Sequence, residues 1–186
     1  MSTPEIAVLV GSLRQGSFTR AVAQALIGLA APRLHLRIVE IGDLPLYNPD
    51  LDEGTPPAAW TRFRGEMAGV DAVLFATPEY NRSMPAAVKN ALDVGSRPYG
   101  QSVWAKKPAA IVSVSPGLLG GFGANHHLRQ PLVFLDMPVL QQPEVYLSKV
   151  QESLNEAGEL SNERTRQFLA DFLARFADWI AQQQPA

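Results

Sequence analysis

Short apolar runs of strand length alternate with segments of helical period along most of the chain. Residues 6–10 and 71–76 are almost wholly apolar, whereas residues 34–41 alternate apolar and polar positions, as a strand with one more exposed face does. The pattern predicts five strands, at residues 6–10, 34–41, 71–76, 108–114 and 139–146. Strands of this length that alternate with helices are typical of a parallel sheet covered on both faces.

The segments between the strands place their apolar residues on one helical face. Val22, Leu26 and Leu29 share such a face in the first of them. Ser161 is the predicted N-cap of the last helix, and residues 42–57, with four prolines and two glycines, are predicted to form a long loop. The five helices are expected at residues 19–31, 58–68, 85–94, within 121–134, and 161–183.

Five strands and five helices favour one α/β domain, residues 1–186, with a flavodoxin-like doubly wound parallel sheet in the order 2-1-3-4-5 and helices on both faces. In such a sheet, ligands bind outside the carboxyl ends of the strands, where the strand order reverses. The loops at that edge are therefore the candidate binding segments: residues 11–18, 77–84 and 115–121.

Composition narrows the classes of function. Apolar residues make up 46% of the chain and charged residues 18%, which favours a packed core over disorder. The net charge of −2, from 16 basic and 18 acidic residues, argues against a nucleic-acid surface. The absence of cysteine excludes disulfides and thiol redox chemistry, so any redox function needs a bound cofactor.

Membrane and targeting signals are also weak. No apolar run approaches the ~20 residues that span a bilayer, so no membrane span is expected. The N-terminal Met1-Ser2-Thr3-Pro4-Glu5 lacks the basic and apolar regions of a secretory signal. We therefore expect a cytoplasmic protein.

The first candidate loop leads directly into a predicted helix. The free N–H groups and the dipole of a helix N-terminus attract an anion. Ser12, Ser17 and Thr19 add hydroxyl donors, and Arg14 adds a guanidinium that suits phosphate oxygens. Neither G-x-G-x-x-G nor G-x-x-x-x-G-K-[ST] is present, which favours the monophosphate of a cofactor or substrate. The alternative is an ordinary turn with an N-cap and a solvated arginine.

The second and third loops have features of a site for a flat ring. Two prolines stiffen residues 77–85, where Tyr80 stands next to the amide of Asn81. The glycines of residues 115–121 allow a ligand to approach the backbone closely. Each loop is also compatible with a simple strand-to-helix turn, but three such loops at one edge of the sheet favour a binding site.

Two long motifs resemble one known family. They are Gly11-Ser12-Leu13-Arg14-x-x-Ser17-x-x-Arg20, and Pro78-Glu79-Tyr80-Asn81-x-Ser83-x-Pro85-Ala86 followed by Lys89-Asn90-Ala91-Leu92-Asp93. Together they resemble the NADPH-dependent FMN reductases, which include bacterial chromate and quinone reductases and some azoreductases. Ser115-Pro116-Gly117-x-x-Gly120 is similar to the third cofactor loop of that family, and residues 44–51 to a stretch near its partner subunit. The resemblance runs from about residue 5 to 180.

The resemblance implies bound FMN, NADPH or NADH as co-substrate, and a homodimer or homotetramer. By position, the phosphate of FMN would be held by Ser12, Arg14, Ser17, Phe18 and Thr19. The isoalloxazine ring would be lined by Pro78, Glu79, Tyr80, Asn81 and Ser83. The other edge of the ring would be lined by Ser115, Pro116 and Gly117.

The implied activity is that of an FMN-dependent NAD(P)H oxidoreductase. Hydride would pass from NAD(P)H to FMN, and two electrons would then pass to a small-molecule acceptor, a quinone, chromate, azo compound or free flavin, by a ping-pong mechanism. No catalytic side chain is expected, because FMN carries the chemistry. No metal is expected either, because the adjacent His126 and His127 would point in different directions on a helix. One alternative is a flavodoxin-type electron carrier, although a net charge of −2 gives little steering toward a protein partner. Another is a phosphate-binding or transferase domain without flavin.

Four further residues have two interpretations each. Tyr47 and Asn48 either cover the flavin of a neighbouring subunit or pack on their own chain. Arg82 and Arg97 either meet the additional phosphate of NADPH or are simply solvated.

Overall fold

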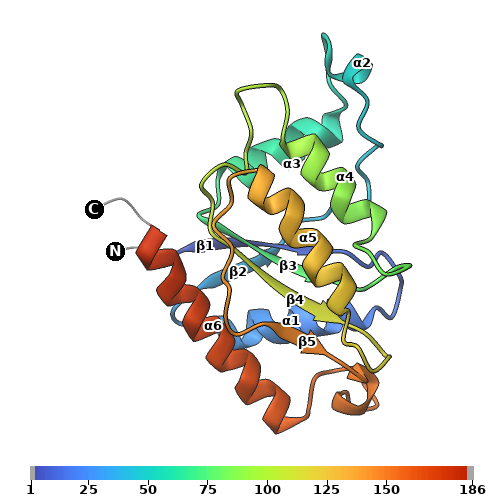
Figure 1. Cartoon of the computed structure of the whole chain (residues 1–186), viewed down its shortest axis with the longest axis vertical. Helices are drawn as coiled ribbons and strands as arrows, with labels where there is room; N and C mark the ends of the chain where they lie inside the picture. The colour runs from blue at the N-terminus through green and yellow to red at the C-terminus, as the bar shows by residue number, and fades with distance from the viewer. Residues whose placement is uncertain (1–2, 184–186) are drawn as a thin grey trace.

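The computed structural model describes residues 3–183, and its central feature is one five-stranded parallel sheet (Figure 1). The strands lie in the order β2-β1-β3-β4-β5, which confirms the predicted flavodoxin-like order. Every neighbouring pair is parallel. The strand bounds are β1 Glu5–Val10, β2 His35–Ile38, β3 Ala72–Thr77, β4 Ala109–Val114 and β5 Val145–Leu147.

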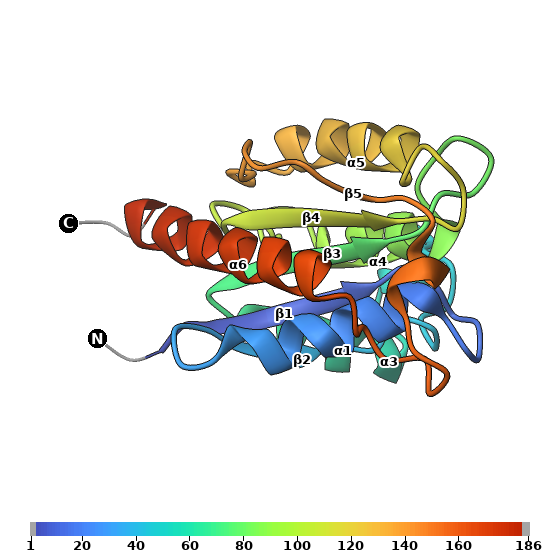
Figure 2. The ribbon, with the colours of Figure 1, turned by 90° about the horizontal axis from the view of Figure 1, so that it is seen from below.

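Helices cover both faces of the sheet, and Figure 2 shows α6 crossing the face that also carries α1. The buried side chains of α3, α4 and α5 form a separate apolar cluster on the opposite face. The long helices are α1 Phe18–Ala30, α3 Ala58–Ala68, α4 Ala86–Gly95, α5 Phe122–Phe134 and α6 Glu163–Gln183. Among the described residues, no helix is both long and apolar enough to cross a membrane.

Strand β1 shows why the central strands read as unbroken apolar runs. Ile6 and Val8 belong to the cluster beneath α1 and α6, whereas Ala7 and Leu9 belong to the cluster beneath α3, α4 and α5. All four are fully buried. A strand with packed helices on both sides has no solvent face, so its sequence does not alternate.

Several predicted boundaries are wrong. Strand β2 covers only 35–38 of the predicted 34–41, and β5 covers 145–147 of the predicted 139–146. The predicted loop 42–57 contains a one-turn helix, α2 Pro49–Asp52. Helix α6 begins two residues after Ser161, and its cap is Asn162, whose Oδ1 accepts the N–H of Thr165 at 3.0 Å. A short 3-10 helix, η1 Val150–Ser153, follows β5.

The sheet brings the three candidate loops to one edge. Val10 at the end of β1 pairs with Ala76, and Thr77 at the end of β3 pairs with Ser113 of β4. Because β1, β3 and β4 are adjacent and parallel, the loops that follow them leave the sheet side by side. The strand order reverses between β1 and β3, so this edge is the switch point at which such sheets bind ligands.

Candidate functional site

The three loops enclose one cleft of about 190 Å³. The first loop contributes Ser12, Arg14, Ser17, Phe18 and Thr19. The second contributes Pro78, Glu79 and Tyr80, and the third contributes Ser115 and Pro116 together with Val114 at the end of β4. The predicted residues Asn81, Ser83 and Gly117 lie outside this lining. Val114 is the one lining residue that sequence reasoning missed, because an apolar strand end carries no chemical signal.

The N-terminus of α1 forms one wall of the cleft. Ser17 is the N-cap, and its hydroxyl accepts the N–H of Arg20 at 3.1 Å. The residues Ser12 and Thr19 are buried, yet their hydroxyls make no hydrogen bond within residues 3–183. The backbone N–H groups of Phe18 and Thr19 also have no acceptor in that part of the chain. This wall therefore offers several unused donors at the positive end of a helix dipole, which suits a phosphate group.

Gly11 lets the first loop approach the second. A Cβ at this position would lie 2.8 Å from a methyl of Val88, 3.0 Å from Pro78 Cδ and 3.3 Å from Pro85 Cγ. The backbone N–H of Gly11 donates to the carbonyl of Ala76 at 2.8 Å, which extends the pairing of β1 with β3 by one residue. The first and second loops can lie this close together because residue 11 is glycine and has no Cβ.

The second loop closes with a tight hairpin. Tyr80 and Ser83 exchange two backbone hydrogen bonds of 3.0 Å each. Between them Asn81 and Arg82 have φ values of 51° and 65°. Positive φ at both central residues is the requirement of a type I′ turn. Tyr80 stands at the start of this hairpin and is 45% exposed, so its ring borders the mouth of the cleft.

The side chains of the second loop also contact α5. The Glu79 carboxylate accepts the backbone N–H of Ala124 at 3.0 Å, and the Ser83 hydroxyl lies 3.1 Å from Nδ1 of His127. Arg82 approaches the Glu79 carboxylate at 3.8 Å. Glu79 and Ser83 were predicted to line the ring, but their polar side-chain atoms are paired with a neighbouring helix.

The third loop is fixed to the segment after β5. The Ser115 hydroxyl accepts the N–H of Gly117 at 3.0 Å. The backbone N–H of Ser115 donates to Leu147, and those of Lys149 and Val150 donate to Gly117 and Ser115. This loop is thus held by backbone pairing on the side away from the first loop, and it forms a rigid wall of the cleft.

An aromatic group borders the third loop without lining the cleft. The rings of Phe122 and His126 are tilted by 47° with centroids 4.3 Å apart, and the Tyr146 hydroxyl lies 3.0 Å from His126 Nε2. Burial raises the pKa of the Tyr146 phenol to about 12, and Glu144 acts in the same direction. The phenol therefore stays protonated at neutral pH and does not serve as a base there.

The segment that holds Tyr47 and Asn48 is anchored on its own chain. The Asn90 side chain accepts the N–H of Tyr47 at 2.8 Å, and Asn48 caps α2. Arg64 binds both carboxylate oxygens of Asp52, at 2.8 and 2.7 Å, and this hydrogen-bonded pair lowers the pKa of Asp52 below its ordinary 3.8. Tyr47 and Asn48 are thus held by hydrogen bonds on their own chain.

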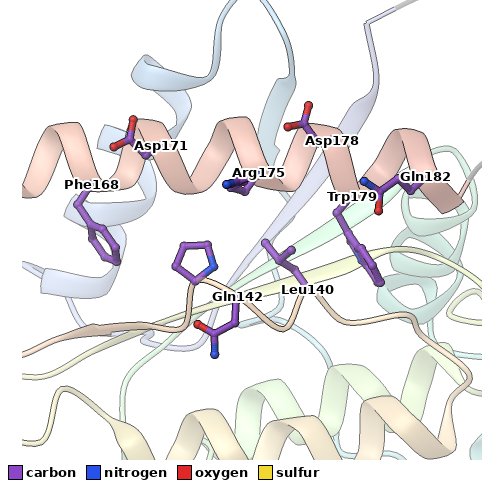
Figure 3. A pocket seen from close by; sticks show the side chains of 9 residues that line it. Leu140, Gln142, Phe168, Asp171, Arg175, Asp178, Trp179 and Gln182 are labelled. Atoms are coloured by element: carbon purple, nitrogen blue, oxygen red, sulfur yellow. The ribbon is translucent and has the colours of Figure 1, made fainter.

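A larger cavity of about 560 Å³ lies far from these loops, between α6 and the segment before β5. Figure 3 shows Arg175 between Asp171 and Asp178 along α6, with Trp179 and Leu140 facing each other across the gap. The cavity contains no residue of the three loops. This cavity lies between α6 and residues 140–143, away from the switch point at which such sheets bind ligands. We therefore do not assign the function to it, although it is larger.

Comparison with known proteins agrees with this geometry. Residues 4–152 match the family model described as NADPH-dependent FMN reductase. A quinone reductase of Pseudomonas putida is 60% identical over 175 residues, which cover 94% of each chain. A 2-hydroxy-1,4-benzoquinone reductase of a Burkholderia species is 44% identical over 176 residues, covering 95% of this chain and 96% of that one.

A solved structure provides the same assignment in three dimensions. The flavoenzyme NAD(P)H:(acceptor) oxidoreductase FerB from Paracoccus denitrificans has a TM-score of 0.90 and 39% sequence identity. The match covers 97% of this chain and 98% of FerB. On the family model, the extent of these identities and the shared fold, the chain belongs to the NADPH-dependent FMN reductase family.

Proposed function

We propose that this protein is an FMN-dependent NAD(P)H oxidoreductase that reduces quinones. The observation that carries the proposal is the cleft at the switch point. There the N-terminus of α1, with N–H groups free to bind an anion, faces the hairpin that begins at Tyr80. This combination matches a ligand with a phosphate at one end and a flat ring at the other. The proposal accounts for the absence of cysteine, because a bound flavin supplies the redox group.

The first loop would hold the phosphate of FMN. Ser12 and Thr19 are largely buried, and their hydroxyls have no hydrogen-bond partner within residues 3–183. Ser17 keeps a free donor while it caps α1. Arg14 is exposed and forms no ion pair within residues 3–183, so its guanidinium is available to an anion. These residues fit a monophosphate better than a larger polyphosphate, since only one short helix terminus faces the cleft.

The second and third loops would hold the ring. Pro78, Tyr80 and Pro116 offer flat or rigid apolar surfaces, and Ser115 borders the opposite side. Glu79 also lines the cleft, and its carboxylate accepts a hydrogen bond from α5. Asn81, Ser83 and Gly117 would contribute as neighbours that fix the shape of the loops.

FMN, when bound, supplies a hydride acceptor and a two-electron donor. The protein's own contribution is placement. Ligand pockets usually enclose about 300–1,000 Å³, whereas this cleft encloses about 190 Å³. A ring held here would therefore leave a face open to solvent, where NAD(P)H and then a quinone would bind in turn. Sharing one open face requires the first product to leave before the second substrate binds, which is the basis for proposing ping-pong order.

A quinone suits the surroundings of the cleft better than chromate does. Leu13 is 57% exposed, and Leu118 and Leu119 are 77% and 56% exposed. These side chains stand on the first and third loops and offer apolar contact to a flat carbocycle. Relatives named quinone reductase and 2-hydroxy-1,4-benzoquinone reductase support the same choice.

A homodimer or homotetramer remains part of the proposal. Leu46 is 76% exposed on a segment that Asn90 and Trp60 hold in place through hydrogen bonds to its backbone. Burial of this exposed apolar side chain against a second copy of the chain would favour assembly. Light scattering of the eluted protein tests this directly: a mass of about 20 kDa, that of the single chain of 20.2 kDa, would contradict it.

The deciding experiment is a visible spectrum of the protein reconstituted with FMN, followed by anaerobic NADPH and then a benzoquinone. Bleaching by NADPH and return of the oxidised spectrum with the quinone are the expected results. A flavin that stays oxidised under NADPH would favour an electron carrier instead. If FMN does not bind at all, the cleft is a phosphate site of another kind.

A further inference from the structure

The contact between Glu79 and α5 joins the ring-binding hairpin to a helix that belongs to another part of the chain. What we infer from this contact rests on the proposed function, FMN binding in the cleft. The Glu79 side chain is only 14% exposed, and its Oε2 accepts the N–H of Ala124 at 3.0 Å, across 45 residues of sequence. A carboxylate that is largely buried and hydrogen-bonded to a backbone amide is held in one orientation.

Helix α5 has no side-chain N-cap within its own segment. Its N-cap is Gly121, with φ of 77° and no side chain to accept a hydrogen bond. The first N–H groups of a helix need an acceptor from elsewhere, and a negative charge there is favoured by the helix dipole. Glu79 supplies both from the second loop. The carboxylate is therefore committed to the helix terminus and not directed at a ligand.

Two further contacts hold the hairpin on the same helix. The Ser83 hydroxyl pairs with His127, one turn further along α5. Gly123 allows the backbones to approach: a Cβ there would lie 2.8 Å from the carbonyl oxygen of Arg82 and 3.0 Å from the Glu79 carboxylate. The hairpin is thus tied to α5 at both of its ends and touches it in the middle.

The hairpin needs such support. Arg82 has a φ of 65°, a conformation that side chains other than glycine, asparagine and aspartate rarely adopt. A residue with unusual φ and ψ angles keeps them when the surrounding structure holds it from several sides. Such residues occur often at functional sites. Here the surroundings are Glu79, Ser83 and the open side of Gly123.

We propose that Glu79 is a positioning residue, which fixes the ring-binding segment from Pro78 to Ser83 by capping α5. It would act through the placement of Tyr80 and the backbone beside it, without giving or taking a proton. The competing interpretation is that the carboxylate acts on the ring or substrate directly.

Glu79→Gln and Glu79→Ala separate these interpretations in the full-length protein. A glutamine keeps an oxygen that accepts the Ala124 N–H, whereas alanine has none. We expect Glu79→Ala to speed hydrogen exchange of the Ala124 amide in the flavin-free protein. It should also weaken FMN binding roughly 10-fold, about the free energy of one hydrogen bond to a charged group, because FMN binding must then order a segment that this bond no longer holds. Glu79→Gln should restore most of both. In the FMN-saturated variants, Glu79→Gln should recover more of the parental kcat than Glu79→Ala does, because only glutamine still holds the segment beside the ring.

The matched control is Asn162→Ala, which removes the cap of α6 but lines no part of the cleft. It should lower the Tm as a lost cap does and leave the affinity for FMN unchanged. If Glu79→Gln is as inactive as Glu79→Ala while both bind FMN normally, the carboxylate acts in the reaction and the positioning role is wrong. Unchanged exchange of Ala124 in Glu79→Ala would also overturn it.

A second pair of variants tests the contact from the helix side. Gly123→Ala and Gly65→Ala both place alanine within a helix, where it is favoured over glycine. Nothing lies within 4 Å of a Cβ at Gly65, whereas a Cβ at Gly123 meets the hairpin. Gly65→Ala should raise the Tm with no change in FMN binding. Gly123→Ala should weaken FMN binding despite its better helix propensity, and parental affinity in this variant would contradict the proposal.

The two proposals fail in different ways. If the parent protein binds no FMN, the proposed function is wrong, and the positioning of a flavin-binding segment falls with it even when Glu79→Ala exposes the Ala124 amide. If the parent binds FMN but neither Glu79→Ala nor Gly123→Ala changes the affinity, only the positioning role is wrong.

Discussion

Replacing Ser17 by alanine should lower both the stability of the protein and its affinity for FMN, by separable amounts. The Ser17 hydroxyl caps α1 through the N–H of Arg20, and the same residue lines the cleft. Losing an N-cap costs about 1 kcal/mol, which corresponds to about 2–4 °C in Tm for a chain of this length. The hydroxyl can accept from Arg20 and donate to a phosphate at once, because it has one donor and two lone pairs.

The expected loss of affinity follows from that second hydrogen bond. A hydrogen bond to a charged group contributes about 1.5–3 kcal/mol, so Ser17→Ala should weaken FMN binding roughly 10- to 150-fold. Titration of the flavin-free protein, with flavin fluorescence as the signal, measures the dissociation constant. Riboflavin provides an internal control, because it has the same ring and no phosphate. Its affinity should be the same for the parent and for Ser17→Ala.

The variant Asn162→Ala separates the two effects of the Ser17 substitution. It removes an N-cap from α6 and so should lower the Tm by a similar amount, while FMN binding stays at the parental level. Equal FMN affinity of Ser17→Ala and the parent would refute the assignment of the α1 terminus to the phosphate. Equal weakening of riboflavin and FMN would refute it too, since the lost contact would then belong to the ring or to the loop as a whole.

Three further substitutions test the surroundings of the site. Gly11→Ala places a methyl 2.8 Å from a methyl of Val88 and 3.0 Å from Pro78; it should weaken FMN binding in a fluorescence titration, because the first and second loops must separate. Gly95→Ala places a methyl 2.6 Å from the ring of the fully buried Trp104; overpacking of this kind costs about 1–3 kcal/mol, to be seen as a lower urea midpoint. Asp52→Asn should cost about 1–3 kcal/mol at pH 7, because it leaves the guanidinium of Arg64 without its carboxylate. Since the folded pKa of Asp52 lies below 3.8, that contribution is complete above this pH and is lost as the pH falls through the folded value, so urea unfolding at pH 7 and pH 3 should show the difference shrinking.

The sheet was predictable because its central strands are buried on both faces. Apolar runs such as 72–77 indicate strands that are buried on both faces, and their alternation with helices favours a doubly wound parallel sheet. The edge strands were harder. Strand β5 pairs over only 145–147, and an isolated pairing of Val139 with Ala109 stands apart from it. Apolar pattern alone does not show where pairing begins and ends.

The sequence placed all five predicted residues of the first loop in the lining of the cleft, but it did not indicate the hydrogen-bond partners of the second loop. Ser17 as a cap and donor depends on three neighbouring residues, which sequence patterns capture. Ser161 and Asn162 are both favoured cap residues, and the prediction of Ser161 is wrong because Asn162 accepts the N–H of Thr165. The destination of the Glu79 carboxylate depends on Ala124, 45 residues away, and no periodic or motif signal connects the two.

The glycines of the third loop also depend on contacts with distant residues, which the sequence does not show. The sequence assigns them to close approach of a ligand, yet a Cβ at Gly120 would lie 2.8 Å from Tyr146, and one at Gly121 would lie 2.9 Å from Ser113. Both have positive φ and pack against their own chain. Only Gly117 meets nothing closer than 3.4 Å, the Ser115 hydroxyl. The glycines near the cleft therefore determine how closely the loops and α5 approach one another, so the shape of this site depends on packing between distant segments as much as on the motifs that line it.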